Sequence, residues 1–108
     1  MPNDQQPLSY NAALVLQALV QGHRYGFEIM KISGLPSGTV YPLLRRMEKS
    51  GLIESRWEDE DEAHGEGRPP RRYYQATEEA ESRLSEARRR LAAQQAALFG
   101  DLTGKELA

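Results

Sequence analysis

The chain has 108 residues, a length typical of one domain with a small core. Its hydrophobic and charged contents, 39% and 28%, indicate a folded globular protein. It has no cysteine, which excludes disulfides, iron–sulfur sites and zinc sites or nucleophiles that need thiolates. Residues 1–10 do not resemble a signal peptide, and no apolar run approaches the roughly 18 residues of a membrane span. We therefore expect a cytoplasmic protein with no membrane contact.

The net charge of −2 hides an uneven distribution. One acidic cluster lies in the middle of the chain and comprises Glu58, Asp59, Glu60, Asp61, Glu62 and Glu66. The residues around it are basic: Arg45, Arg46, Lys49, Arg56, Arg68, Arg71 and Arg72. A local basic surface, more than the total charge, indicates binding to nucleic acid.

A first helix is predicted after Ser9, a residue type that caps helix N-termini. Its apolar residues recur at helical spacing: Ala12, Ala13, Val15, Leu16, Leu19 and Val20. Gly22 suits the end of this helix. A second, shorter helix is predicted from about Tyr25 to Ser33, with Phe27 and Met30 inward and Ile29 as a third candidate.

A third helix is predicted between Ser37, as its cap, and Gly51, as its stop. The inward face comprises Val40, Leu43, Leu44 and Met47. The outward face comprises Thr39, Tyr41, Pro42, Arg45, Arg46 and Lys49. Pro42 lies early enough in the helix to remove at most one backbone hydrogen bond.

Two short extended runs follow, over 52–57 and 72–76. The stretch between them begins with the acidic cluster and continues through Gly65, Gly67, Pro69 and Pro70. We expect this stretch to form neither helix nor strand, so that the two runs make a β-hairpin with a long tip. At least one of Tyr73 and Tyr74 should belong to the core.

Thr77 should cap the last helix, with Glu78, Glu79 and Glu81 in a first turn that favours acidic residues. Leu84, Leu91 and Leu98 are seven residues apart, which predicts a coiled-coil seam. About twenty helical residues span ~30 Å, about the width of a small domain. We therefore expect a second chain to cover a dimerisation surface made by Leu84, Ala87, Leu91 and Leu98. The alternative is that the seam packs only on its own domain.

The order of elements is typical of a winged helix-turn-helix, in which the second helix of a closely joined pair enters the major groove. The fold class is thus mainly α with a small β-hairpin, ending in a long C-terminal dimerisation helix. The expected organisation is a DNA-binding domain over 8–76 and the dimerisation helix over 77–99. Residues 1–7 and 100–108 are expected to be flexible.

Several stretches resemble the PadR family of bacterial transcription regulators. They are Tyr25-Gly26-Phe27-Glu28, the run 35–48 (LPSGTVYPLLRRME), Gly51-Leu52-Ile53, the run 70–74 (PRRYY) and Thr77-Glu78-Glu79. The resemblance implies a winged-helix domain that dimerises through its C-terminal helix. It also implies repression of nearby genes, often relieved by a small molecule. The single C-terminal helix is similar to the short form of the family.

The predicted DNA-binding residues are Ser37, Thr39, Tyr41, Pro42, Arg45, Arg46, Lys49, Arg68, Arg71 and Arg72. The expected partner is a palindromic double-stranded operator bound by a homodimer, with a small-molecule effector at the dimer interface as a further partner. The arginines of the hairpin have an alternative role, since they could merely neutralise the acidic cluster. We expect that cluster to point away from DNA.

Enzymatic chemistry has little support in this sequence. His64-Gly65-Glu66 matches the H-x-E of zinc deaminases, but their downstream cysteines are missing. We expect no catalytic residues, no metal site and no cofactor. The competing function is a winged-helix module that binds proteins instead of DNA, although such a module has no need for Arg45, Arg46 and Lys49 on an outward helix face.

Overall fold

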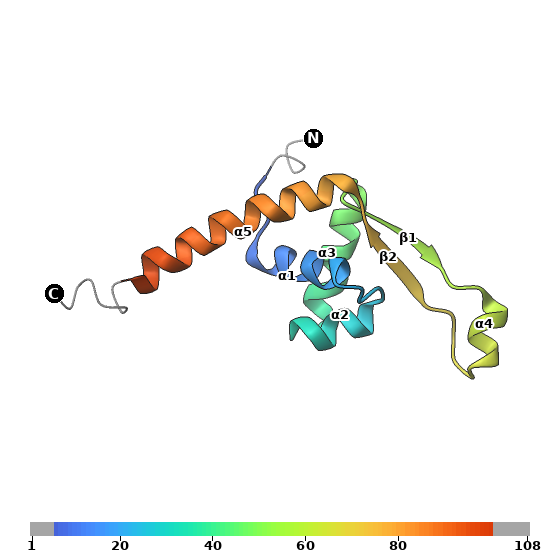
Figure 1. Cartoon of the computed structure of the whole chain (residues 1–108). Helices are drawn as coiled ribbons and strands as arrows, with labels where there is room; N and C mark the ends of the chain where they lie inside the picture. Colours follow the sequence, from blue (N-terminus) through green and yellow to red (C-terminus); the bar gives the residue numbers. More distant parts are fainter. Residues whose placement is uncertain (1–5, 101–108) are drawn as a thin grey trace.

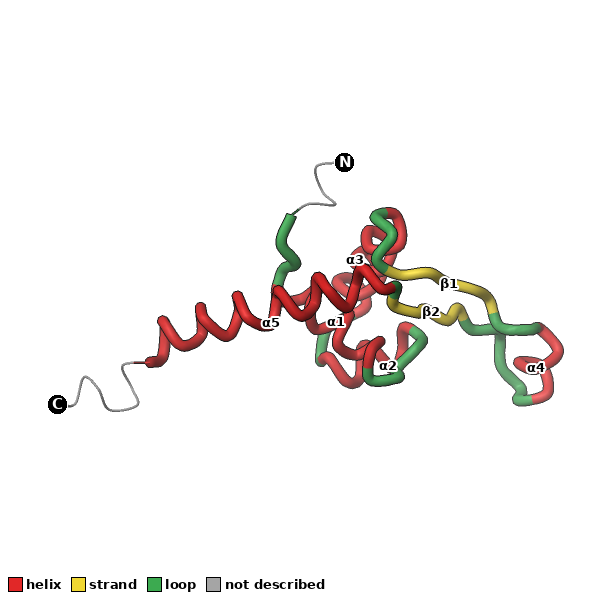
Figure 2. Tube along the Cα trace, turned by 45° about the horizontal axis from the view of Figure 1, so that its top comes forward, coloured by secondary structure: helices red, strands yellow, loops and turns green. Residues whose placement is uncertain are grey.

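The computed structural model describes residues 6–100, and Figure 1 shows their arrangement. The elements are α1 (Tyr10–Val20), α2 (Gly26–Ser33), α3 (Ser37–Lys49), β1 (Ile53–Trp57), α4 (Glu60–Gly65), β2 (Arg72–Ala76) and α5 (Glu78–Phe99). The first three helices form a compact group (Figure 1). The hairpin β1–β2 projects from this group on one side, and α5 extends past it on the other (Figures 1 and 2).

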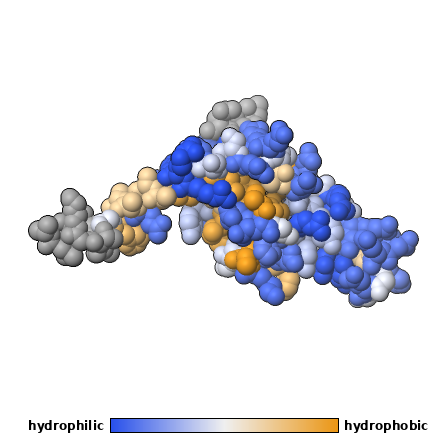
Figure 3. Space-filling model, viewed as in Figure 1, coloured by the Kyte–Doolittle hydropathy of each residue, from blue (hydrophilic) through white to orange (hydrophobic). Residues whose placement is uncertain are grey.

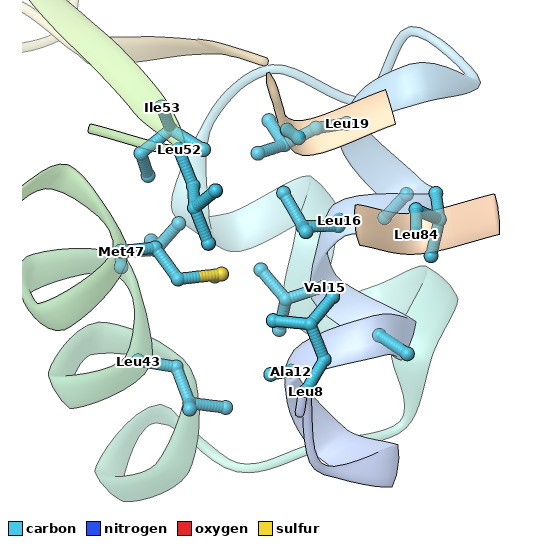
Figure 4. Packing of buried hydrophobic residues seen from close by; sticks show 14 of the residues in the cluster. Leu8, Ala12, Val15, Leu16, Leu19, Leu43, Met47, Leu52, Ile53 and Leu84 are labelled. Atoms are coloured by element: carbon cyan, nitrogen blue, oxygen red, sulfur yellow. The ribbon is translucent and has the colours of Figure 1, made fainter. Parts of the chain in front are cut away.

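The core lies where α2, α3 and the first half of α5 pack against α1, and Figure 4 shows some of its side chains. Leu16, Ile29 and Leu44 are fully buried there. Ser9 caps α1 as predicted, because its side chain accepts a hydrogen bond from the Ala12 N–H at 3.1 Å. The predicted inward face of α1 is confirmed except at Val20, which is exposed because it ends the helix beyond the core.

The inward face of α2 differs from the prediction. Ile29 is completely buried, whereas Phe27 is 59% exposed and lies beside the ammonium group of Lys31. The cause is the helical period: Gly26 and Ile29 share the buried face, and Phe27 points about 100° away from Gly26. Gly34 ends the helix in the left-handed conformation, which glycine adopts without steric cost.

Helix α3 begins as its sequence indicates, but Ser37 is not its cap. Pro36 holds the capping position with extended backbone angles, and its carbonyl oxygen accepts the N–H groups of Thr39 and Val40. Ser37 is the first helical residue instead. The predicted inward face is confirmed, since Val40, Leu43, Leu44 and Met47 are all buried.

The hairpin is confirmed, with β1 and β2 antiparallel and Arg56 opposite Tyr73. The segment before α2 extends this small sheet, because Tyr25 forms a bridge to Tyr73 and the Tyr74 N–H donates to the Arg24 carbonyl at 2.8 Å. Tyr74 belongs to the core, as expected for one of the two adjacent tyrosines.

The prediction of an irregular hairpin tip was wrong for residues 60–65, which form α4 and include three members of the acidic cluster, Glu60, Asp61 and Glu62. Asp59 caps this helix by accepting the Asp61 N–H at 2.8 Å. The acidic side chains in its first turn interact favourably with the positive end of the helix dipole. Ala63, near the end of the helix, is fully buried. A cap, acidic residues and one buried apolar side chain therefore suffice for a short helix.

Helix α5 begins after Thr77, but the threonine hydroxyl does not cap it. That hydroxyl donates instead to the carbonyl groups of Gly51 and Leu52, so it ties α5 to the turn before β1. The helix packs mainly along α1. Ala80, Leu84 and Ala87 are buried in the core, while Leu98 is 71% exposed.

The predicted seam therefore divides into two parts, which corrects the assignment of Leu84 and Ala87 to a dimer surface. Both pack within their own chain, and Leu91 is half-buried against the same core. From Ala92 onward α5 extends beyond the core, and the apolar side chains of this part of the helix are exposed (Figure 3). The expected boundary between the DNA-binding domain and the dimerisation helix, at residue 77, therefore precedes helical turns of α5 that belong to the core of the domain.

The expected flexible ends, 1–7 and 100–108, fall largely outside the described residues. Within residues 6–100, no helix is long and apolar enough to cross a membrane.

Candidate nucleic-acid interface

The surface of α3 opposite the core carries the predicted reading residues. Arg45, Arg46 and Lys49 are exposed, and their side chains form no ion pair with any carboxylate of residues 6–100. Thr39 and Pro42 are half-buried, and Ser37 is exposed. The helix therefore presents uncompensated positive charge along its last two turns.

Tyr41 lies on the N-terminal half of α3 and packs against the first turn of α2. A Cβ built on Gly26 would lie 2.6 Å from Cε1 of Tyr41 and closer still to its hydroxyl. Any larger residue at position 26 would therefore force the Tyr41 ring to move. Tyr41 remains 39% exposed, so the contact orients the ring without hiding it.

A polar bridge connects α3 to the hairpin. The Ser55 hydroxyl donates to Oε2 of Glu48 at 2.6 Å and accepts from Nε of Arg72 at 3.0 Å. Arg72 also pairs with the Glu48 carboxylate at 3.4 Å and covers the ring of Trp57. The bridge sets the angle between helix and hairpin, and it occupies Arg72, a predicted DNA contact.

A second ion pair closes the hairpin tip. The Arg68 guanidinium contacts both oxygens of Glu58, at 2.5 and 2.9 Å, and one oxygen of Glu66 at 3.2 Å. The Glu58 side chain is only 5% exposed and also accepts from the Arg71 backbone N–H and the Tyr73 hydroxyl. The Arg68 hydrogen bond lowers the pKa of Glu58 to about 2, and the same contact raises the pKa of Arg68.

Arg68 therefore pairs with two members of the acidic cluster, Glu58 and Glu66, which fits the alternative role considered for it. Its side chain is only 19% exposed, and the same contact holds α4 against the end of β1. A role of Arg68 in DNA contact stays a prediction.

Arg71 differs from Arg68, because its guanidinium lies 4.0 Å above the ring of Tyr25 and forms no ion pair within the described chain. Tyr25, Tyr41 and Arg71 line one open cleft of about 590 Å³ between α2, α3 and the hairpin. The cleft places the hairpin arginine and the α3 tyrosine on one side of the molecule.

Three of these features have no clear signal in the sequence. The bridge of Glu48 depends on the angle between α3 and β1, and the burial of Glu58 depends on the fold of the tip. Gly26 has a weak signal, because it lies in a stretch that carries the family resemblance. No group of three or more potential metal-ligating side chains occurs within residues 6–100.

The family model of the PadR-like transcriptional regulators matches residues 15–86, which include all of α2, α3, α4, both strands and the first turns of α5. The chain belongs to the PadR-like family. No curated protein matches the sequence.

Solved structures agree with this assignment. A PadR family regulator from Clostridium difficile R20291 is 27% identical, with a TM-score of 0.65 over 93% of this chain and 100% of the other. A PadR family regulator from Eggerthella lenta is 29% identical, with a TM-score of 0.64 over 86% and 84% of the two chains. The PcaV regulator from Streptomyces coelicolor is 18% identical, with a TM-score of 0.75 over 94% and 68%, which shows the shared fold.

This PadR-like protein is therefore a winged-helix, DNA-binding transcription regulator with a long C-terminal helix. Helix α3 is the second helix of its helix-turn-helix pair, and β1–β2 is the wing. The family is one of transcriptional regulators.

Proposed function

We propose that this protein represses transcription by binding a palindromic operator as a homodimer in the cytoplasm. The observation that carries the proposal is the uncompensated basic face of α3, at Arg45, Arg46 and Lys49. In helix-turn-helix proteins this helix enters the major groove, where arginine can form paired hydrogen bonds with guanine. Tyr41 and Thr39 precede the arginines on the half of the helix that enters the groove most deeply.

The second chain is proposed to cover the end of α5. Ala92, Ala93, Ala96 and Ala97 are exposed there, together with Leu98 and Phe99. Small side chains permit close approach of two helices, and the two larger ones supply apolar surface that is otherwise left in water. This part of the helix follows Leu91 directly. The first half of α5 therefore packs on the core of its own chain, and the second half is proposed to pack on the partner chain.

A homodimer with two reading helices requires two half-sites. Their centres should lie one helical turn apart, ~34–36 Å, or a multiple of that distance. We also propose that a small-molecule effector binds at the dimer interface and relieves repression. The PcaV regulator, which shares the fold, has been solved with its natural ligand, and this likeness supports the proposal of a ligand site.

The test is a fluorescence anisotropy titration of DNA from upstream of the protein's own gene against a scrambled duplex. Arg45→Ala should weaken operator binding by ~1–3 kcal/mol per half-site if Arg45 reads a base. If Arg45 contacts only phosphate, both duplexes should weaken alike. Arg89→Ala is the matched control, since Arg89 is an exposed arginine of α5.

The competing function, a protein-interaction module, predicts no preference for any DNA. A wild-type protein that binds operator and scrambled duplexes equally weakly would favour that function and refute ours. Tyr41→Phe should be milder than Tyr41→Ala, because it removes only the hydroxyl. Circular dichroism on each variant separates loss of binding from loss of folding.

A further inference from the structure

Two arginines of α5 bind the short segment that precedes α1. The Arg83 guanidinium donates to the Gln6 carbonyl, and the Arg90 guanidinium donates to the Leu8 carbonyl at 2.7 Å. We call residues 6–8, which cross α5 in Figures 1 and 2, the N-terminal strap. The strap is itself anchored, because the Leu8 side chain is only 6% exposed and belongs to the core. Both arginines therefore connect α5 to a fixed part of the DNA-binding domain.

A third arginine of α5 makes a similar contact with α1. The Arg88 guanidinium donates to the side-chain amide oxygen of Gln17. At about 100° per residue, Arg88 lies on one flank of the face that α5 packs against the core, and Arg83 and Arg90 lie on the other, each about 70–90° from its centre. Hydrogen bonds on both flanks oppose rotation of α5 in either direction. The packed face comprises Ala80, Leu84, Ala87 and Leu91.

The apolar contact alone restrains the orientation of α5 only weakly. Two of the four residues of the packed face are alanines, which form low ridges for packing between helices. Apolar burial is also non-directional, whereas a hydrogen bond weakens steeply when its angle changes. Hydrogen bonds from a charged donor are stronger than neutral ones, and the Glu86 carboxylate, 3.9 Å from Nε of Arg90, restrains that arginine further. The orientation of α5 therefore depends on its three arginines.

A small change in this orientation has a large effect at the far end of the helix. The 22 residues of α5 span ~33 Å, so a tilt of about 10° moves that end by ~6 Å. Neighbouring base pairs lie only ~3.4 Å apart along a duplex. In the proposed homodimer, the two DNA-binding domains are joined through the far ends of their α5 helices. The angle between α5 and its own domain therefore sets the distance between the two reading helices.

We propose that Arg83, Arg88 and Arg90 are positioning residues that set the half-site spacing accepted by the homodimer. This inference rests on the proposed function and deepens it, because it names the contacts that determine the operator spacing. It requires no contact of these arginines with DNA. Arg89, between Arg88 and Arg90 in the sequence, is exposed and offers a matched control.

The test is a set of duplexes that carry two half-sites from upstream of the protein's own gene, with the spacer changed in steps of one base pair. The wild type should prefer one spacing. Arg88→Ala and the double variant Arg83→Ala/Arg90→Ala should lower the ratio of affinities between that spacing and its neighbours, by roughly two- to tenfold for each hydrogen bond lost. Arg89→Ala, with the same loss of charge, should keep the wild-type ratio. Arg90→Lys should retain more of the preference than Arg90→Ala, because lysine can still donate to the Leu8 carbonyl.

A duplex with a single half-site separates the orientation of the domains from binding by each domain. Spacing does not affect this duplex, so each arginine variant should bind it as tightly as Arg89→Ala does. An arginine variant that weakens on this duplex and on every spacing alike, with a lower melting temperature, would show a merely structural role and overturn the inference. An unchanged spacing preference in the double variant would overturn it as well.

A measurement without DNA tests the same orientation directly. The chain has no cysteine, so Glu54→Cys, at an exposed position of β1, attaches one spin label to each DNA-binding domain. Pulsed electron paramagnetic resonance then gives the distribution of distances between the two labels of a dimer. This distribution should broaden in Arg83→Ala/Arg90→Ala and stay as narrow in Arg89→Ala as in the wild type. Equal widths in all three proteins would contradict the positioning role.

The outcomes distinguish the two proposals. If the wild type is a dimer that prefers its operator, and the spacing preference survives the loss of all three arginines, only the positioning role is refuted. A wild type that is monomeric, or that binds operator and scrambled duplexes equally, would refute the proposed function and this inference with it.

Discussion

The division of α5 into a core part and an exposed part predicts opposite consequences for two chemically identical substitutions. Leu84 is 2% exposed and Leu98 is 71% exposed, and they are two heptads apart on one helix. Replacing a buried leucine by alanine removes its apolar contacts and leaves a cavity, at a cost of ~2–5 kcal/mol. Substitutions at exposed positions usually change the stability of the folded chain by less than ~0.5 kcal/mol.

Leu84→Ala should therefore lower the free energy of unfolding by ~2–5 kcal/mol, a large part of the total for a domain of this size. With a urea dependence of ~1–3 kcal/mol/M, the unfolding midpoint should fall by on the order of 1–2 M. Leu98→Ala should leave the folding of the single chain unchanged but weaken association. Burying one leucine contributes ~1.5–3 kcal/mol, and a symmetric dimer contains two.

The assay is urea unfolding followed by circular dichroism at two protein concentrations, together with sedimentation velocity. Because dimerisation stabilises the folded state by mass action, the wild-type midpoint should rise with concentration, and that rise should shrink in Leu98→Ala. The reasoning would be refuted if Leu98→Ala unfolds at as low a midpoint as Leu84→Ala at the lower concentration. A wild-type monomer at micromolar concentration would also refute it.

Three further predictions concern the interface. Gly26→Ala should reduce DNA affinity because it displaces Tyr41, while the melting temperature stays near the wild-type value because alanine favours the helix by about 1 kcal/mol. DNA titration and thermal unfolding of the same variant test this prediction. A loss of DNA affinity together with an equally clear loss of thermal stability would contradict it. Ser55→Ala should cost about 1–3 kcal/mol in urea unfolding because it removes two hydrogen bonds that join the wing to α3, and Ser55→Thr should restore most of this. Glu58 stabilises the folded state above about pH 4.5 and loses this effect as the pH falls towards 2. The difference in melting temperature between the wild type and Glu58→Gln should therefore shrink over that range. A difference that does not change with pH would exclude the lowered pKa of Glu58 as its cause.

The DNA-binding half of the molecule was largely readable from local patterns. The inward face of α3 follows from the spacing of Val40, Leu43, Leu44 and Met47, since a helix places these residues on one side. The same spacing leaves Arg45, Arg46 and Lys49 on the other side. The hairpin is similarly local, because two extended runs joined by one connection pair with each other.

Burial within short elements was less predictable. Phe27 is as apolar as Ile29, and one residue of uncertainty in the helix face decides which of them enters the core. The acidic cluster showed the opposite error, because the glycines and prolines that follow it suggested a loop, while the Asp59 cap and buried Ala63 favour α4. Marginal segments of this kind depend on contacts that single residues make with the rest of the fold.

The sequence by itself determined the order of all the elements except α4, the outward basic face of α3 and the family, because each rests on spacing within a short stretch. The tertiary structure alone decided which arginines are available: Arg68 is held by Glu58, Arg72 by Glu48, and Arg71 is not paired with any acid of the described chain. These three are nearly adjacent in sequence and chemically identical. Their difference comes from carboxylates brought close by the packing of the wing on α3 and of α4 on the wing, which no local pattern records.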